Sequence, residues 1–191
     1  MKKLLFAIAL LISTSTFAQL QIGIKGGVNA SNFSGKNLEG YKKEGLVGFH
    51  VGGYLDIPVA GIFSVKPEVL WSTQGAKLED ATGGKTDYKL NYVNVPVLAK
   101  FDLGGAYVEF GPQFGFKASE NIGNSTINDF AKGLDLSGAV GLGFNSGRGF
   151  GIAARYFAGL SKVSDYEFGN TKPDYKNSVF QLSLTYNFLN N

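Results

Sequence analysis

The chain has 191 residues, enough for one domain, with 27 glycines, 14% aromatic residues and only 17% charged residues. Soluble globular domains carry roughly 25% charged residues, so the composition favours a β-rich protein that alternates its apolar residues. The net charge of +3, without a long basic run, argues against a nucleic-acid-binding protein. The absence of cysteine excludes disulfides, thiolate metal sites, cysteine nucleophiles and a lipid-anchored cysteine.

The first 18 residues have the features of a signal peptide. Lys2 and Lys3 precede an apolar stretch over Leu4–Ile12, and Thr16-Phe17-Ala18 matches a small-x-small cleavage site. The apolar stretch is shorter than the about 20 residues that a membrane-spanning helix needs. We therefore expect export, cleavage after Ala18 and a single domain over residues 19–191.

Eight segments alternate apolar and polar residues with the period of two that is typical of a β-strand. In chain order they cover Leu20–Ser31, Val47–Ile57, Phe63–Thr73, Tyr92–Phe101, Ala106–Lys117, Leu134–Asn145, Phe150–Ser161 and Ser178–Phe188. The last is the clearest, because Phe180, Leu182 and Leu184 share one face with two further aromatic residues. The opposite face of this segment is mostly polar, and we expect it to be the closing strand of a barrel.

Long and short connections alternate strictly between these segments. The long ones are Asn32–Leu46, Gln74–Asn91, Ala118–Gly133 and Lys162–Asn177, and the short ones are Pro58–Ile62, Asp102–Gly105 and Ser146–Gly149. Outer-membrane barrels have an even number of strands, brief periplasmic turns and longer outer loops. The sequence thus predicts an all-β fold, an eight-stranded antiparallel up-and-down transmembrane β-barrel with four long outer loops and short periplasmic turns.

Charge placement decides which face of the strands meets lipid. The apolar faces carry no charge, whereas the opposite faces carry Lys25, Asp56, Lys66, Glu68, Lys100, Glu109, Lys117, Asp135 and Arg155. A charge facing lipid would cost about 2–4 kcal/mol at the midplane. A narrow lumen would also explain the many small residues on the charged faces. We favour the membrane barrel over a soluble barrel with an apolar interior.

Buried charges are retained when they are paired, so we expect a salt-bridged plug in the lumen. We expect Lys66, Lys100 and Arg155 to pair with Glu68, Glu109 and Asp135, and we assign Lys25 and Asp56 to the same network. A structural filling role is the main hypothesis. A gated or narrow pore that binds or passes a small solute is the alternative.

Aromatic and proline residues add two further expectations. Aromatic belts are expected at both membrane interfaces, formed at the short-turn ends by Phe63, Phe101, Phe144, Phe150, Tyr186 and Phe188, and at the long-loop ends by Trp71, Phe114, Phe116 and Phe180. Pro67, Pro96 and Pro112 fall inside strands, where each removes a hydrogen-bond donor. We expect a β-bulge at one or more of these prolines.

Four short motifs resemble the PorT-like outer-membrane β-barrel family of Gram-negative bacteria. They are Gly23–Asn29 (GIKGGVN), Tyr92–Lys100 (YVNVPVLAK), Phe110–Phe116 (FGPQFGF) and Arg155–Ser161 (RYFAGLS). The resemblance spans essentially all of residues 19–191 and implies an eight-stranded barrel in the outer membrane. It brings no catalytic residues, and the link of the namesake to protein secretion is not carried over.

The sequence predicts no catalytic, cofactor or metal site. His50, the only histidine, is expected in the lumen, bonded to polar neighbours. A nucleophile site needs a base and an orienting group within reach, and nothing along the chain pairs His50 with a particular serine. A lipid-modifying enzyme therefore ranks third. The acidic residues of the long loops lack calcium-loop spacing, and the glycines after Ser137 miss the dinucleotide fingerprint.

The expected location and partners follow from the predicted fold. We expect a monomer in the outer membrane, in contact with lipid and lipopolysaccharide, inserted by the general barrel-assembly machinery. The long loops are the expected place for an unknown ligand or protein to bind.

Overall fold

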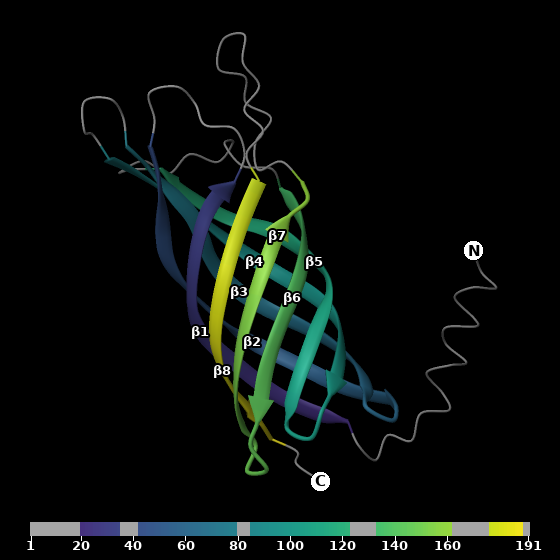
Figure 1. Cartoon of the computed structure of the whole chain (residues 1–191). Coiled ribbons are helices and arrows are strands. Elements are labelled where there is room, and N and C mark those ends of the chain that lie inside the picture. The colour runs from purple at the N-terminus through teal and green to yellow at the C-terminus, as the bar shows by residue number, and fades with distance from the viewer. Residues whose placement is uncertain (1–19, 35–41, 80–84, 123–132, 162–175, 189–191) are drawn as a thin grey trace, which may run out of the picture.

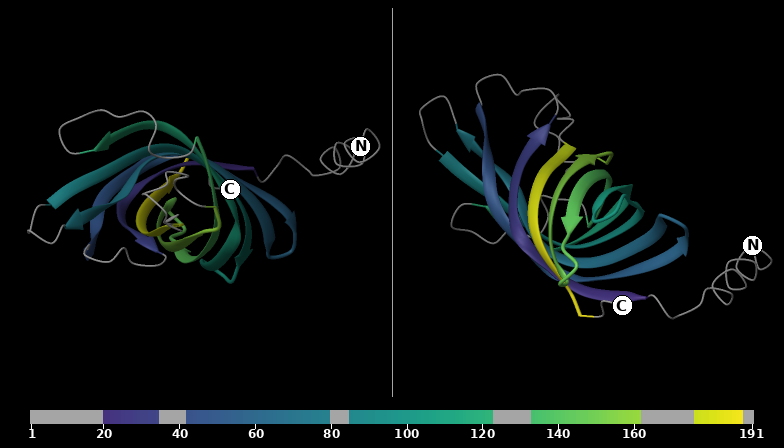
Figure 2. Two further views of the ribbon diagram at one scale, coloured as in Figure 1. Left: turned by 90° about the horizontal axis from the view of Figure 1, so that it is seen from above. Right: turned by 60° about the horizontal axis from the view of Figure 1, so that its bottom comes forward.

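The computed structural model describes residues 20–34, 42–79, 85–122, 133–161 and 176–188. Its strands are β1 (Gln21–Ser34), β2 (Lys42–Ala60), β3 (Phe63–Glu79), β4 (Lys85–Asp102), β5 (Ala106–Ile122), β6 (Leu134–Asn145), β7 (Phe150–Gly159) and β8 (Lys176–Asn187). Each pairs antiparallel with the next, and β8 pairs with β1, which closes the barrel (Figures 1 and 2). The predicted eight-stranded antiparallel barrel is confirmed. The predicted signal peptide, residues 1–18, lies outside the described residues.

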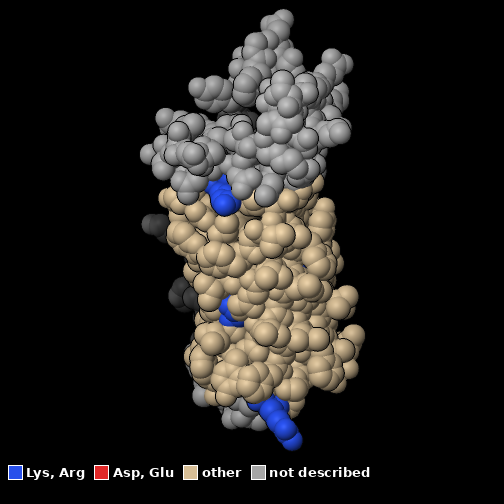
Figure 3. Space-filling model, turned by 90° about the vertical axis from the view of Figure 1, so that its left-hand side faces the viewer, with Lys and Arg blue, Asp and Glu red and all other residues tan. Residues whose placement is uncertain are grey.

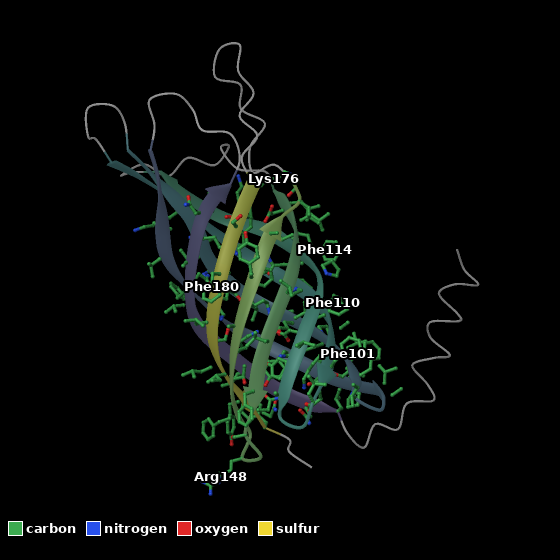
Figure 4. All side chains as sticks on the ribbon, viewed as in Figure 1. Phe101, Phe110, Phe114, Arg148, Lys176 and Phe180 are labelled. Carbon is green, nitrogen blue, oxygen red and sulfur yellow. The ribbon has the colours of Figure 1, made fainter. Side chains whose placement is uncertain are left out.

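The apolar faces of the strands point outward, as predicted. Leu184 is 70% exposed on the outer wall, whereas Arg155 is 1% exposed in the lumen. Phe101, Phe110, Phe114 and Phe180 all project away from the barrel (Figure 4). On the face shown in Figure 3, the described wall is uncharged except for one small basic patch, and basic residues lie at its two margins. The soluble barrel with an apolar interior is therefore wrong.

Among the described residues, no helix has the length and apolar character needed to cross a membrane.

The short connections are tight turns at one end of the barrel (Figure 1). Between β4 and β5, the Asp102 carboxylate accepts hydrogen bonds from the backbone N–H groups of Gly104 and Gly105 at 3.0 and 3.2 Å. Both glycines have a positive φ, 83° and 99°, which residues with a Cβ rarely adopt. Phe188 N–H donates to Ile22 C=O at the same end, where β8 meets β1.

Six strands run further toward the long loops than the sequence predicted, β1 and β8 by a few residues and β2, β3, β4 and β5 by more. At the long-loop end β2 begins at Lys42, β3 ends at Glu79, β4 begins at Lys85 and β5 ends at Ile122. Much of the predicted loops at residues 32–46 and 74–91, and the first part of the predicted loop at 118–133, is therefore strand. The predicted segments end earlier, but the backbone ladder continues as far as the pair Glu79↔Lys85.

The bulge expected at Pro67, Pro96 or Pro112 is wrong, whereas a register shift does lie beside Pro58 of β2, which the sequence analysis placed in a short connection. The register runs without a shift past Pro67, Pro96 and Pro112, and the shifts lie instead between Gly45 and His50, Pro58 and Ala60, and Asn91 and Tyr92. A missing backbone hydrogen bond costs only about 1 kcal/mol net. A one-residue slip would turn every later side chain to the other face and would direct Lys66 or Glu68 at lipid.

Aromatic rings pack together near the turn end of the barrel. The ring centroids of Phe63 and Phe101 lie 5.3 Å apart, and those of Phe150 and Tyr186 lie 4.8 Å apart. Trp71, at 40% exposure, is on the outer wall nearer the loop end. This distribution is typical of the interfacial belts of membrane barrels.

Arginine substitutions on the two faces of the strands test which face contacts lipid. We expect Leu184→Arg and Val97→Arg to abolish insertion, because each places a charge in lipid at a cost of about 2–4 kcal/mol. Ser137→Arg points into the lumen beside the Asp135 carboxylate, 3.2 Å from the Ser137 hydroxyl, and is expected to insert. Membrane fractionation with a heat-modifiability gel measures this, and equal tolerance at both kinds of position would contradict the assignment.

Candidate functional site

Five charged side chains meet in the middle of the lumen, and we call them the central ion cluster. They are Lys25 of β1, Lys66 and Glu68 of β3, Glu109 of β5 and Arg155 of β7, each at most 3% exposed. The cluster is thus supplied by alternate strands. Inward side chains from alternate strands converge on the centre of the lumen from different directions, whereas those of adjacent strands lie next to each other on one wall.

Arg155 joins opposite walls of the barrel, because β3 and β7 lie four strands apart in a ring of eight. Its two terminal nitrogens donate to the two Glu68 oxygens, both at 2.8 Å, in a bidentate pair. Its Nε donates to Glu109 Oε1 at 2.9 Å, and Nη2 donates to the same oxygen at 2.5 Å. A planar guanidinium fits such a fork better than the point charge of a lysine.

The two lysines make longer contacts with the same carboxylates. Lys25 Nζ lies 3.4 Å from Glu68, and Lys66 Nζ lies 3.6 Å from Glu68 and 3.4 Å from Glu109. Three cations therefore face two carboxylates, which leaves a formal surplus of one positive charge. The ring of Tyr54, 4.6 Å from Lys66 Nζ, partly compensates this surplus by a cation–π contact.

A glycine makes room for the cluster. Gly141 of β6 pairs with Glu109 on one side and with Arg155 on the other. A Cβ at this position would lie 3.2 Å from both Arg155 Cγ and Glu109 Oε1 and 3.0 Å from the Ala154 carbonyl. The expectation that small residues provide space among the lumen charges holds at this position.

A second ion pair lies nearer the turns. Lys100 Nζ is 2.6 Å from Asp56 Oδ2 and 3.5 Å from Asp102. The ring of Tyr107 lies between this ion pair and the central ion cluster, 4.9 Å from Lys100 Nζ and 5.1 Å from Lys66 Nζ. The ring of Tyr107 therefore links this pair to the central ion cluster, a role that the sequence analysis did not assign to it.

The predicted pairing of Asp135 with a cation is wrong. Its carboxylate accepts hydrogen bonds from the Ser161 and Ser137 hydroxyls at 2.7 and 3.2 Å, and no cation of the described residues pairs with it. Gly141, the neighbour of Arg155, is six residues further along β6 than Asp135, which corresponds to about 20 Å of strand. Arg155 cannot span this distance and bonds to the nearer carboxylates.

His50 is hydrogen-bonded to polar neighbours, as expected, although the sequence did not identify them. Its Nδ1 lies 2.8 Å from Asn29 Oδ1, and its Nε2 lies 2.9 Å from the Ser183 hydroxyl. Asn29 Nδ2 is occupied as a donor, notably to Ser72 Oγ at 2.9 Å, so Nδ1 carries the proton and Nε2 accepts from Ser183. The expected lumen position is confirmed.

The pairing of His50 with a particular serine could not be found along the chain. Ser183 is 133 residues away in sequence and is brought to His50 only when β8 closes on β1. The order serine, histidine, asparagine is that of a nucleophile, a base and an orienting group. His50 is 1% and Ser183 5% exposed, so the described lumen leaves no room for a substrate beside the hydroxyl.

The described residues contain no group of three or more His, Cys, Asp or Glu side chains placed to hold a metal ion.

An apolar outer wall around an ionic lumen defines an integral membrane β-barrel. The chain belongs to the outer membrane protein beta-barrel domain family, whose model matches residues 17–165. This membership supports a location in the outer membrane. It does not distinguish the PorT-like group within the outer-membrane barrels.

Solved outer-membrane barrels share the fold. Neisserial surface protein A aligns with a TM-score of 0.57 at 12% identity, covering 87% of this chain and 97% of its own. Ail, the attachment invasion locus protein of Yersinia pestis, aligns with a TM-score of 0.54 at 18% identity, covering 89% and 99%. At these identities the likeness shows the fold alone. No curated protein matches the sequence.

Two substitutions by methionine compare how much Arg155 and Lys25 contribute to the stability of the central ion cluster. We expect Arg155→Met to lower the free energy of unfolding by about 3–5 kcal/mol, because it strips two buried carboxylates of their best partner. Lys25→Met removes the surplus positive charge and leaves two cations facing two carboxylates, so its effect should be much smaller. Urea unfolding in lipid vesicles, followed by gel mobility, measures both. Equal losses would contradict the central position of Arg155.

Proposed function

We propose that this protein is a non-enzymatic outer-membrane barrel whose lumen is filled for stability and whose long loops serve interaction or envelope integrity. The observation that carries the proposal is the bidentate pair between Arg155 and Glu68, which joins opposite walls at the middle of the barrel. Eight-stranded barrels have an interior just wide enough for side chains to fill. A solute passing through would have to break this pair in a low-dielectric surrounding, where it is strongest.

The biological context of the proposal is an exported monomer. The predicted signal peptide over residues 1–18 directs the chain out of the cytoplasm, and the barrel-assembly machinery inserts it with Phe188 in the recognised closing strand. Lipid and lipopolysaccharide surround the apolar wall. The four sequence motifs favour the PorT-like group within the family, without its link to secretion.

Planar-bilayer recordings test the filled lumen. We expect no steady conductance from the unaltered protein, because the central ion cluster closes the path. The double variant Arg155→Ala, Glu68→Ala removes the link between the walls together with its charges and should give a measurable conductance. Val140→Ala on the outer wall is the matched control and should stay silent. Steady conductance of the unaltered protein would replace the structural role by a pore.

The second candidate function, a lipid-modifying hydrolase, is favoured by one observation, the chain of Ser183, His50 and Asn29. Its burial argues against it. We expect His50→Ala and Ser183→Ala to leave the lipid A composition of the cell unchanged in mass spectrometry, with expression matched on a heat-modifiability gel. Loss or gain of an acyl chain in either variant would show catalysis and would contradict the non-enzymatic proposal.

A further inference from the structure

Two apolar grooves lie side by side on the outer wall, across β1, β8, β7 and β6. Between them runs a row of direct cross-strand partners, Gly26, Leu184, Ile152 and Phe144. The groove toward the turns, bordered by Ile24, Tyr186 and Phe150, has a volume of about 670 Å³. The groove toward the loops, bordered by Val28, Leu182, Ala154 and Leu142, has a volume of about 570 Å³. Both volumes are in the range of small-molecule sites, about 300–1,000 Å³.

Gly26 connects the two grooves. It is the member of the dividing row without a side chain, so the row is interrupted between Val51 and Leu184. A Cβ on Gly26 would lie 3.7 Å from the His50 carbonyl and 4.0 Å from Val51 Cγ2, which are ordinary contacts. A larger residue is thus sterically admissible, and the glycine leaves an opening that packing does not require.

A basic group stands at the turn end of the first groove. This groove reaches Ser146 at the start of the β6–β7 turn. Arg148, two residues further, is exposed and projects from the tip of this turn, beyond the aromatic residues (Figure 4). Arginine binds phosphate through two parallel hydrogen bonds. The face therefore combines an apolar double groove with a cation at its membrane-interface end.

We propose that this face binds one glycerophospholipid of the periplasmic leaflet, with its phosphate at Arg148 and one acyl chain in each groove. Outward residues two apart along a strand are separated by about 7 Å, so the two grooves run in parallel at a spacing that suits two linked chains. The short turns mark the periplasmic end, where the leaflet consists of phospholipid rather than lipopolysaccharide. The occupant is a lipid because the grooves lie within the lipid-facing band.

The proposed lipid site depends on the protein being an outer-membrane barrel, but it does not depend on the proposal that the lumen is filled. A conducting lumen in the bilayer recordings would leave the lipid site intact, and loss of the lipid site would leave the lumen proposal intact.

Native mass spectrometry tests the site on the full chain reconstituted in nanodiscs of phosphatidylglycerol and phosphatidylethanolamine and released in detergent. We expect one phospholipid to remain bound. Gly26→Leu, which closes the opening between the grooves, and Arg148→Glu, which repels phosphate, should each weaken phospholipid binding roughly tenfold, measured as the retained fraction over a series of detergent concentrations and equivalent to about 1.4 kcal/mol.

Two matched variants distinguish binding at this site from non-specific contact with the surrounding lipid. Gly138→Leu adds the same side chain to an outward glycine of β6 with open surroundings, away from both grooves, and should retain the lipid. Arg148→Lys keeps the charge and should retain most of it. Full retention by Gly26→Leu, an equal loss in Gly138→Leu, or retention of lipopolysaccharide when that lipid is offered in competition would each overturn the proposal.

Discussion

The hydrocarbon around the barrel is the constraint on which the rest of the structure depends. It disfavours charges on the lipid-facing wall and unpaired backbone groups, so the sheet closes and the charged residues of the central ion cluster turn inward. The strict alternation of the strands carries out this separation, from Leu184 outside to Arg155 inside. It also explains why the prolines of β3, β4 and β5 leave the register unchanged, since a lost donor costs less than a charge turned into lipid.

Inside the barrel the same charges must satisfy one another without water. The residues of the central ion cluster come from alternate strands, so their long side chains converge from opposite directions. Gly141 leaves the space that Arg155 and Glu109 occupy. Breaking a buried pair is expensive even where forming it contributes little net stability. The cluster therefore resists being opened, and Arg155 is the member on which both carboxylates depend.

The sequence predicts the number of strands, the order of long and short connections and the facing of each residue, because all three follow from the period of two. It also predicts that Lys66 and Arg155 pair with Glu68 and Glu109, as the structure shows, but it does not assign the other lumen partners. Asp135 was expected to face a cation and bonds to serines, while Lys25 and Asp56, placed in the network without partners, bond to Glu68 and Lys100. Ser183 reaches His50 only through closure of the barrel. Such pairings depend on strand stagger and height, which alternation does not encode.

A lumen occupied by its own side chains leaves two surfaces where this barrel can meet other molecules. One is the loop end, where the paired backbones of β2, β3, β4 and β5 continue beyond the segments predicted from the sequence, as far as Glu79↔Lys85. The other is the wall itself, where selection for an uncharged surface does not require a smooth one. Gly26 is informative in this respect, because neither the register nor the packing around it demands a glycine. An opening that the surrounding packing does not require lies between the two grooves, and this supports the proposal that this part of the wall binds a lipid.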